Sequence, residues 1–171
     1  MDQQMKTIHK ALYDSPIGHL VLVSDDQYLL NLYPASKLPP IPDVNLVETE
    51  PIYLAKQWLN AYFSGSSPDA NTVPMRLNGT PFQVKCWQQL LLIPYGSTTT
   101  YKAIAKELAK HSATGKMSCQ AVGQAIGRNP IAIIVPCHRV IGSDGTLTGY
   151  AGGLELKKKL LIHEQSIKAA L

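Results

Sequence analysis

The stretch Ile131-Ala132-Ile133-Ile134-Val135-Pro136-Cys137-His138-Arg139-Val140-Ile141 joins an apolar run to a cluster of reactive side chains. The apolar run over residues 131–135 is short and is bounded by Pro130 and Pro136. Such a short run bounded by turn residues predicts a short buried strand. A thiol, an imidazole and a guanidinium follow directly after it, so the strand would deliver a chemically active segment.

Cys137 is the candidate nucleophile of this segment. A free thiol with a pKa near 8.5 is only a few per cent ionised at neutral pH, so it needs a base or a positive environment, which His138 and Arg139 offer. Consecutive side chains point apart, however, so a direct contact between Cys137 and His138 is disfavoured and a bridging water is the natural solution. From the chemistry alone, a buried inert cysteine beside a surface histidine is the favoured alternative.

The composition places the chain among globular proteins. It has 171 residues, 45% of them hydrophobic and 16% charged, which suits one or two small domains and excludes extensive disorder or a long coiled coil. No apolar run approaches the roughly 20 residues that span a membrane. The three cysteines are an odd number without paired spacing, which favours a reducing compartment, and we expect a cytoplasmic protein. Zinc-type, C-x-x-C and phosphate-loop motifs are absent, so no metal is expected.

Charge is divided unevenly along the chain. Residues 1–80 contain five Lys/Arg and eight Asp/Glu, whereas residues 81–171 contain eleven and four. The positive second half indicates an anionic partner, with nucleic acid as the first candidate. A chance surface composition is about equally compatible with the charge alone.

The first half predicts a strand-rich domain. Strands are expected over 7–13, 19–24 and 28–33, with a turn over 14–18, and a helix over 52–63 on the stripe Leu54, Trp58 and Tyr62. Residues 64–78 are rich in Ser, Pro and Asn. We therefore predict domains 1–78 and 79–171.

The second half predicts mainly helices. Thr80-Pro81-Phe82-Gln83 forms a capping box, and the stripe Phe82, Cys86, Leu90 and Ile93 makes Cys86 a packing residue. Helices over 101–110 and 118–127 are joined by a short link, which is typical of a helix-turn-helix. Helix 118–127 has an apolar stripe, Cys119, Val122 and Ile126, opposite a stripe of small and amide residues, Gln120, Gly123, Gln124 and Gly127. That second stripe suits close approach to DNA, or equally tight packing on a neighbour.

The C-terminal part predicts a glycine-rich loop and a last helix. Residues 142–153 hold five glycines, so this loop bends sharply or lets another group approach closely. A helix is expected from about 154 to 166, with Leu156, Leu160 and Leu161 inward and the lysines 157–159 at its start.

Residues 133–141 closely resemble the active-site signature of the O6-alkylguanine-DNA alkyltransferases, also called methylated-DNA–protein-cysteine methyltransferases. The resemblance covers about residues 80–165, with weaker support from the turn Ser15-Pro16-Ile17-Gly18. Further motifs fall in family order: Thr80-Pro81-Phe82-Gln83, Ile93-Pro94-Tyr95-Gly96, Thr100-Tyr101, Ala121-Val122-Gly123, Asn129-Pro130, Leu147-Thr148-Gly149-Tyr150-Ala151-Gly152-Gly153 and Leu160-Leu161-Ile162-His163-Glu164.

The resemblance implies an α+β fold, with a ribonuclease-H-like α/β scaffold domain before a mostly helical domain that carries the helix-turn-helix and the cysteine. It implies DNA repair in one irreversible turnover: the protein flips O6-alkylguanine, and possibly O4-alkylthymine, out of duplex DNA and transfers the alkyl group to Cys137. His138 would be the base, acting through a water, and Glu164 would orient it. Asn129 would pin the active-site turn, and Tyr101 would donate to the departing guanine.

The resemblance also implies how substrate and DNA are held. The Val140 carbonyl would accept from the guanine amine, the Ala151 N–H would face O6, and Tyr150 would lie in the base pocket. Binding is expected in the minor groove, mostly to phosphates, by a monomer without cofactor. The predicted DNA contacts are Gln120, Ala121, Gly123, Gln124, Arg128 and Ser143. Gln120 departs from the family, which commonly has arginine there to fill the gap left by the flipped base, so we expect weaker or slower base extrusion.

Three other functions stay open. A lesion-binding protein of the same fold would recognise alkylguanine and transfer nothing, although such relatives lack the acceptor cysteine. A thiol hydrolase would need a histidine remote in sequence from Cys137 and an oxyanion hole. A structural domain with a buried Cys137 would react slowly with thiol reagents.

Overall fold

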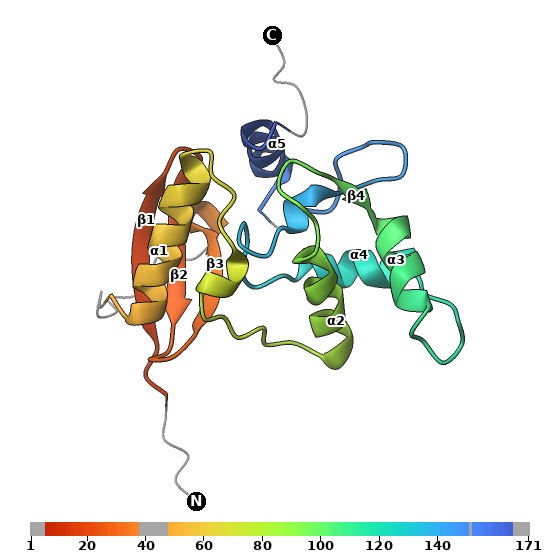
Figure 1. Cartoon of the computed structure of the whole chain (residues 1–171), viewed down its shortest axis with the longest axis horizontal. Helices are drawn as coiled ribbons and strands as arrows, with labels where there is room; N and C mark the ends of the chain where they lie inside the picture. The colour runs from red at the N-terminus through yellow and green to blue at the C-terminus, as the bar shows by residue number, and fades with distance from the viewer. Residues whose placement is uncertain (1–5, 38–47, 151, 166–171) are drawn as a thin grey trace, which may run out of the picture. The chain divides into compact units, whose positions relative to one another are not determined.

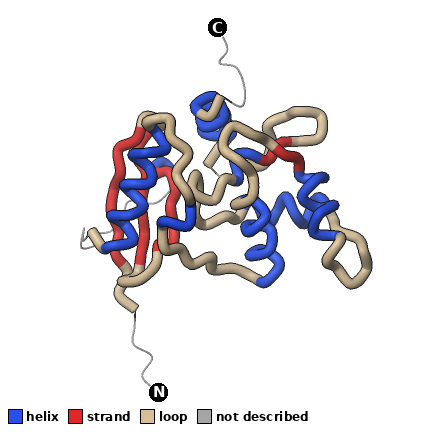
Figure 2. The backbone as a smooth tube through the Cα atoms, viewed as in Figure 1, coloured by secondary structure: helices blue, strands red, loops and turns tan. Residues whose placement is uncertain are grey.

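The computed structural model describes residues 6–37, 48–150 and 152–165 of the chain. The chain folds into two compact units, the first ending at Arg76 and the second beginning at Leu77. The first holds a small sheet with a helix, and the second is mostly helical, so the predicted α+β class is confirmed (Figures 1 and 2).

The first unit is built on an antiparallel three-stranded sheet in the order β1-β2-β3. The strands are β1 (His9–Ser15), β2 (Gly18–Ser24) and β3 (Leu29–Pro34), close to the predicted ranges. Ser15 pairs with Gly18, so the first hairpin turns on two residues, and Gly18 adopts φ +113° there. The sheet follows directly from local sequence, because each strand is joined to the next by a short connection.

Helix α1 (Glu50–Phe63) covers one face of this sheet (Figure 1). Thr49 caps it by accepting from the Ile52 amide at 3.4 Å. Trp58 and Tyr62 are buried as predicted, whereas Leu54 is only half-buried and Leu59 is fully buried in its place. Short 3-10 turns, η1 (Ala35–Lys37) and η2 (Ala70–Thr72), complete the unit.

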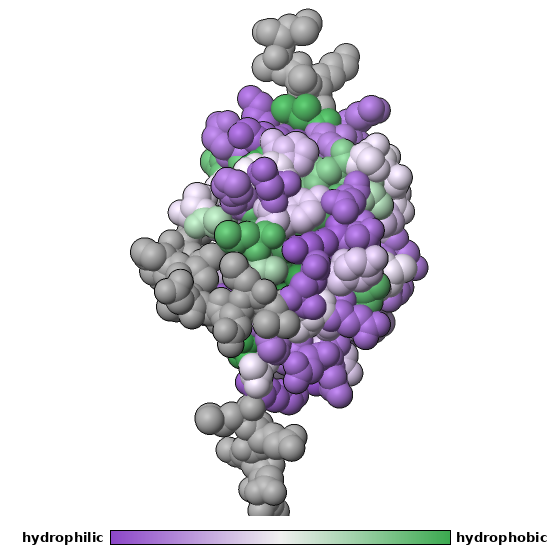
Figure 3. Space-filling view, turned by 90° about the vertical axis from the view of Figure 1, so that its left-hand side faces the viewer, coloured by the Kyte–Doolittle hydropathy of each residue, from purple (hydrophilic) through white to green (hydrophobic). Residues whose placement is uncertain are grey.

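The surface near β1 carries no continuous apolar face in the view of Figure 3, where hydrophobic residues form small groups between hydrophilic ones. Ile8, Leu12 and Tyr53 are the large hydrophobic side chains of this unit that are exposed among the described residues. Scattered exposure of this kind is ordinary for a folded surface.

The second unit opens with α2 (Pro81–Leu90), which carries the predicted capping box: Thr80 accepts from the Gln83 amide, and the Gln83 side chain accepts from the Thr80 amide. Cys86 is fully buried, as predicted. The indole of Trp87 donates to the Ala125 carbonyl at 2.8 Å and so joins α2 to the core of the unit.

The helix-turn-helix consists of α3 (Tyr101–Ala109) and α4 (Cys119–Gly127), each close to its predicted range. Val122 and Ile126 are buried as expected. Cys119 is exposed, so its assignment to the apolar stripe was wrong, and Ala125 takes the inward position instead. Cys119 is the first residue of α4, where the side chain lies beyond the packed part of the helix.

The strand predicted over 131–135 was wrong. All of its side chains except Ala132 are buried, but the backbone makes tight turns, with the Ile134 amide donating to the Ala132 carbonyl around Ile133 at φ +71°. The only strands of this unit within the described residues are β4 (Thr99–Thr100) and β5 (Val140–Ile141), which pair in parallel. Helix α5 (Leu154–His163) closes the unit.

Candidate active site

Cys137, His138 and Arg139 form one 3-10 turn, η3 (Cys137–Arg139), and all three are buried. Pro136 makes the entry sharp, because the Cys137 amide donates to the Val135 carbonyl across it at 2.8 Å. The Arg139 amide then donates to the Pro136 carbonyl at 3.1 Å. This turn lets three consecutive side chains meet different partners, which a strand would not allow.

Asn129 holds the turn from inside. Its side-chain amide donates to the carbonyls of Ile131 at 3.3 Å and Val135 at 2.8 Å, and to Sγ of Cys137 at 3.2 Å. Its side-chain oxygen accepts from the Ile131 amide at 3.0 Å. One residue thus fixes both ends of the turned segment and touches the thiol.

Glu164 lies at the end of α5 and is buried between two partners. One carboxylate oxygen is hydrogen-bonded to Nε2 of His138, and the other accepts from Nε of Arg139 at 2.6 Å. Arg139 also donates to the Ile93 carbonyl at 2.7 Å. Arg139 therefore serves the carboxylate, rather than giving Cys137 the positive neighbour that the sequence left open.

Burial sets the protonation of these groups. It raises the pKa of the Cys137 thiol to about 11, against smaller lowering effects of Asn129 and Lys157. It also lowers the pKa of His138, although Glu164 opposes this. Burial alone would raise the pKa of Glu164, but the hydrogen bonds and charges of His138 and Arg139 lower it to about 2. At neutral pH the site holds a thiol, a neutral imidazole and a carboxylate.

Two polar atoms near the thiol are buried and have no hydrogen-bond partner among the described residues: Nδ1 of His138 and the hydroxyl of Tyr150. Burial raises the pKa of Tyr150, and the Cys137 thiolate raises it further, so the phenol stays protonated. Buried polar atoms without partners are costly, and in a reactive site they indicate groups reserved for a ligand or a proton.

Tyr101 begins α3 beside the glycine-rich loop. Its hydroxyl donates to the Thr148 carbonyl at 2.8 Å, and a Cβ added to Gly149, at φ +69°, would lie 3.2 Å from that hydroxyl. Val140 follows η3, and its carbonyl accepts from the side chain of Lys157. The structure thus brings Tyr101, Val140 and Cys137 to one site. Ala151 lies outside the described residues.

Lys157 is the residue that the sequence analysis missed, since it was grouped with Lys158 and Lys159 at the start of the last helix. It is fully buried. The signal was present: Lys157, Leu160, Leu161 and Glu164 are spaced i, i+3, i+4, i+7, which places them on one helical face. The leucines on that face indicated the core, and the lysine was overlooked because of its charge.

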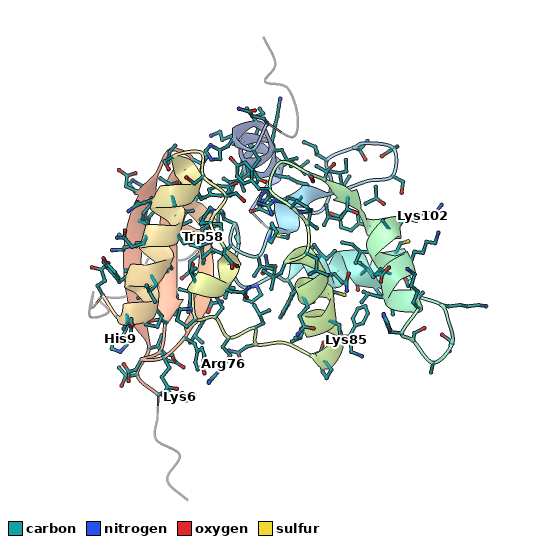
Figure 4. All side chains as sticks on the ribbon, viewed as in Figure 1. Lys6, His9, Trp58, Arg76, Lys85 and Lys102 are labelled. Atoms are coloured by element: carbon teal, nitrogen blue, oxygen red, sulfur yellow. The ribbon has the colours of Figure 1, made fainter. Side chains whose placement is uncertain are left out.

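The candidate DNA contacts of α4 divide into two groups. Gln120, Gln124 and Arg128 are exposed, as is Ser143 in the glycine-rich loop, while Ala121 and Gly123 are half-buried. A Cβ on Gly123 would lie 3.7 Å from the Tyr101 ring, so that glycine packs beside α3 as well as toward the surface. The lysines Lys85 on α2 and Lys102 on α3 project outward from their helices (Figure 4).

The described residues show neither a membrane-spanning helix nor a metal-binding cluster. They contain no helix long and apolar enough to cross a membrane. They also contain no group of three or more His, Cys, Asp or Glu side chains arranged to hold a metal ion.

Two family models match this chain. Residues 8–77 match the ribonuclease-like domain of 6-O-methylguanine DNA methyltransferase, and residues 81–166 match its DNA-binding domain. The chain belongs to the 6-O-methylguanine DNA methyltransferase family. As a member of this family it is a DNA-repair methyltransferase, and the resemblance stated from the sequence is confirmed.

Relatives cover nearly the whole methyltransferase chain. The methylated-DNA–protein-cysteine methyltransferase of Methanosarcina acetivorans is 44% identical over 164 residues, 93% of this chain and 99% of the relative. The Mycobacterium tuberculosis O6-methylguanine methyltransferase structure has a TM-score of 0.74 at 42% identity and covers 96% of both chains. Mycobacterium tuberculosis OGT in complex with DNA has a TM-score of 0.77 at 41% identity, covering 94% of this chain and 96% of that one.

Proposed function

We propose that this methyltransferase repairs duplex DNA by moving the alkyl group of O6-alkylguanine directly and irreversibly onto Sγ of Cys137. One observation carries the proposal: the buried thiol lies on the same turn as His138, whose Nε2 is engaged by Glu164 and whose Nδ1 has no partner among the described residues. A nucleophile, a base and an orienting carboxylate are the parts that activate a thiol.

The transfer proceeds by displacement at carbon. His138 Nδ1 takes the thiol proton through a water molecule, and Glu164 stabilises the resulting imidazolium. The thiolate attacks the alkyl carbon, so an S–C bond forms while the C–O6 bond breaks and its electron pair stays with guanine. Tyr101 gives its proton to the departing guanine, so the base leaves neutral, and the proton taken up by His138 returns through water to restore the Tyr101 phenol. The thioether cannot undergo thiol exchange, so each chain acts once.

The base pocket is the space around Tyr150 and the glycine-rich loop. Extruding a base costs a few kcal/mol, which stacking and hydrogen bonds in the pocket must offset. Tyr150 contributes an aromatic side chain and a free hydroxyl, and the Val140 carbonyl accepts from the guanine amine. The Ala151 N–H, assigned from the family to O6, belongs to the proposal only. Activity on O4-alkylthymine would use the same thiol.

DNA is held by the second domain, residues 79–171, while residues 1–78 act as scaffold. The exposed residues of α4, with Ser143, face the minor groove, where small side chains fit a narrow space. Cationic side chains such as Arg128 neutralise phosphates, so binding weakens with salt and depends little on sequence. The related mycobacterial protein crystallised with DNA supports a DNA-binding surface in this chain. We infer a reducing, cytoplasmic environment, because the acceptor must be a free thiol. We also infer that the protein acts as a monomer.

The deciding measurement is the intact mass of the protein after incubation with a duplex that contains one O6-methylguanine. We expect a gain of one methyl group per chain, none in Cys137→Ser, and an unchanged gain in Cys119→Ser, which removes an exposed thiol. Tight lesion binding without a mass gain would instead assign the lesion-binding function. Turnover of ester or peptide probes would indicate a thiol hydrolase, and neither binding nor gain would leave a structural domain.

Extrusion of the base and binding in the minor groove are tested by two separate measurements. The fluorescence of 2-aminopurine placed beside the lesion should rise on binding, because extrusion of the neighbour unstacks it. Methyl groups added to the major-groove edge of flanking cytosines should leave the affinity unchanged. Quenched fluorescence, or a loss of affinity with these methyl groups, contradicts the corresponding step.

A further inference from the structure

Lys157 is the one buried lysine within residues 6–37, 48–150 and 152–165, with 0% of its surface exposed. Its neighbours Lys158 and Lys159 on α5 reach the surface in part or fully. Burying an ammonium is expensive unless hydrogen bonds and a nearby negative charge compensate it. The contacts of Lys157 therefore indicate which groups stabilise the buried ammonium, and from these its function can be inferred.

Two hydrogen bonds and one ring contact of Lys157 join three parts of the site. Its Nζ donates to the Val140 carbonyl on β5 and, at 2.9 Å, to the Thr148 carbonyl in the glycine-rich loop. It also lies 5.7 Å from the centroid of the Tyr101 ring on α3. All of these residues surround the space that the proposed function gives to the flipped base.

The negative partner of Lys157 is not a carboxylate. Within the described residues no Asp or Glu oxygen lies at salt-bridge distance from its Nζ. Burial lowers the pKa of Lys157 to about 8, and the anionic form of Cys137 acts in the opposite direction. The ammonium in turn favours ionisation of the Cys137 thiol. Its counter-charge thus forms only when Cys137 loses its proton.

We propose that Lys157 is a positioning residue for alkyl transfer: its buried ammonium stabilises the Cys137 thiolate and holds the Val140 and Thr148 carbonyls around the base. This inference rests on the proposed function, and it assigns Lys157 no direct contact with the alkyl group.

Thr148 shows why two donors matter. Its carbonyl accepts from both Tyr101 at 2.8 Å and Lys157 at 2.9 Å. When the Tyr101 hydroxyl turns to the guanine, Thr148 loses one partner and keeps the charge-assisted one. Without Lys157, freeing Tyr101 would leave that carbonyl unpaired, so Tyr101 would turn less readily to the guanine during the transfer step.

The test compares Lys157→Met, Lys157→Arg and the matched control Lys159→Met, an exposed lysine of the same helix. Single-turnover transfer is measured at saturating O6-methylguanine duplex, and affinity for that duplex is measured with Cys137→Ser in each background. We expect Lys157→Met to transfer on the order of 100-fold more slowly, as for loss of one preorganised charged donor, with affinity within about threefold. Lys157→Arg should recover part of the rate, and Lys159→Met should transfer normally.

A second readout is specific to charge. The rate at which iodoacetamide modifies Cys137 is followed by mass at pH 7, where Lys157 keeps its proton. This rate should be lower in Lys157→Met and unchanged in Lys159→Met, because loss of the buried ammonium lowers the fraction of thiolate. An unchanged rate in Lys157→Met, or a transfer rate within threefold of the unaltered protein, overturns the proposal. If the unaltered protein gains no methyl group, the proposed function fails, while the iodoacetamide rate still decides the role of Lys157.

The unaltered protein provides a check that needs no folded variant. The charged and titratable groups near Lys157 are Cys137 and His138 on η3 and Tyr101 on α3. Transfer should slow above about pH 8, where Lys157 loses its proton, although thiolate formation alone would make it faster. A rate that rises steadily from pH 8 to pH 10 contradicts the inference.

Discussion

The side-chain amide of Asn129 donates to Sγ of Cys137 at 3.2 Å while it also donates to the Val135 carbonyl at 2.8 Å. The Cys137 thiol and the backbone that presents it therefore depend on one residue. A change at Asn129 should therefore affect both the stability of the turn and the environment of the thiol.

Asn129→Ala should lower the free energy of unfolding by about 1–3 kcal/mol, because the buried Val135 carbonyl loses its partner. Alkyl transfer should slow as well, since the thiol loses a donor that favours its ionised form. Urea unfolding and single-turnover transfer measure the two effects. Asn71→Ala, at an exposed asparagine, is the control, and equal stability of the two variants would contradict the assignment.

At Ile133 the glycine variant should be more stable than the alanine variant, which is the reverse of the usual order. It is buried at φ +71°, a conformation that costs an L-residue about 1–2 kcal/mol and glycine nothing. Ile133→Gly should therefore be about 1 kcal/mol more stable than Ile133→Ala. At Ile131, buried without a positive φ, the alanine variant should be the more stable. Urea unfolding of the four variants decides, and the same order at both positions excludes strain at Ile133.

The three thiols should react in opposite orders with two reagents. Iodoacetamide at neutral pH should modify the exposed Cys119 first, because Cys86 and Cys137 are buried and burial raises the pKa of each to about 11. O6-methylguanine duplex should modify Cys137 alone. Peptide mapping by mass spectrometry reads both. Methylation of Cys119 by the duplex would mean that exposure, and not the site, selects the acceptor.

Stability should fall at high pH through the buried thiols. The pKa of Cys137 in the folded protein, about 11, lies above its ordinary value of 9.0. The protonated thiol therefore contributes its full share to the free energy of unfolding below about pH 9, and this share is lost as the pH rises through 11. The stability of the unaltered protein relative to Cys137→Ser should therefore decrease between pH 9 and pH 11. Cys86→Ser should show the same trend, since burial raises the pKa of Cys86 alike. Urea unfolding across this range tests both, and a flat difference rejects them.

Gln120→Arg should bind lesion DNA more tightly or transfer faster. Gln120 is exposed on α4, and an arginine there would add charge and a planar group to fill the gap left by the flipped base. Transfer rate and affinity are measured at one fixed salt concentration. Lys159→Arg, which introduces an arginine without changing the net charge, is the control. If neither quantity changes, Gln120 does not limit base extrusion.

The sequence by itself determined the elements whose signals are local. The hairpin strands, the capping box at Thr80 and the two helices of the helix-turn-helix all follow from residues a few positions apart. The family was predicted for the same reason, because residues 133–141 and the further motifs between about residues 80 and 165 are short runs of consecutive residues in family order.

Only the tertiary structure decided the backbone of residues 131–135 and the burial of Lys157. Buried turns and buried strands share the same apolar composition, so the residues themselves predicted a strand there. The resemblance to the family did assign Asn129 to the active-site turn, but only the structure shows its side chain replacing a sheet as hydrogen-bond partner for that backbone. Lysine is ordinarily a surface residue, and its burial depends on two carbonyls, of Val140 and Thr148, that lie 17 and 9 residues before it. Such partners are set by packing between segments, and no local pattern records them.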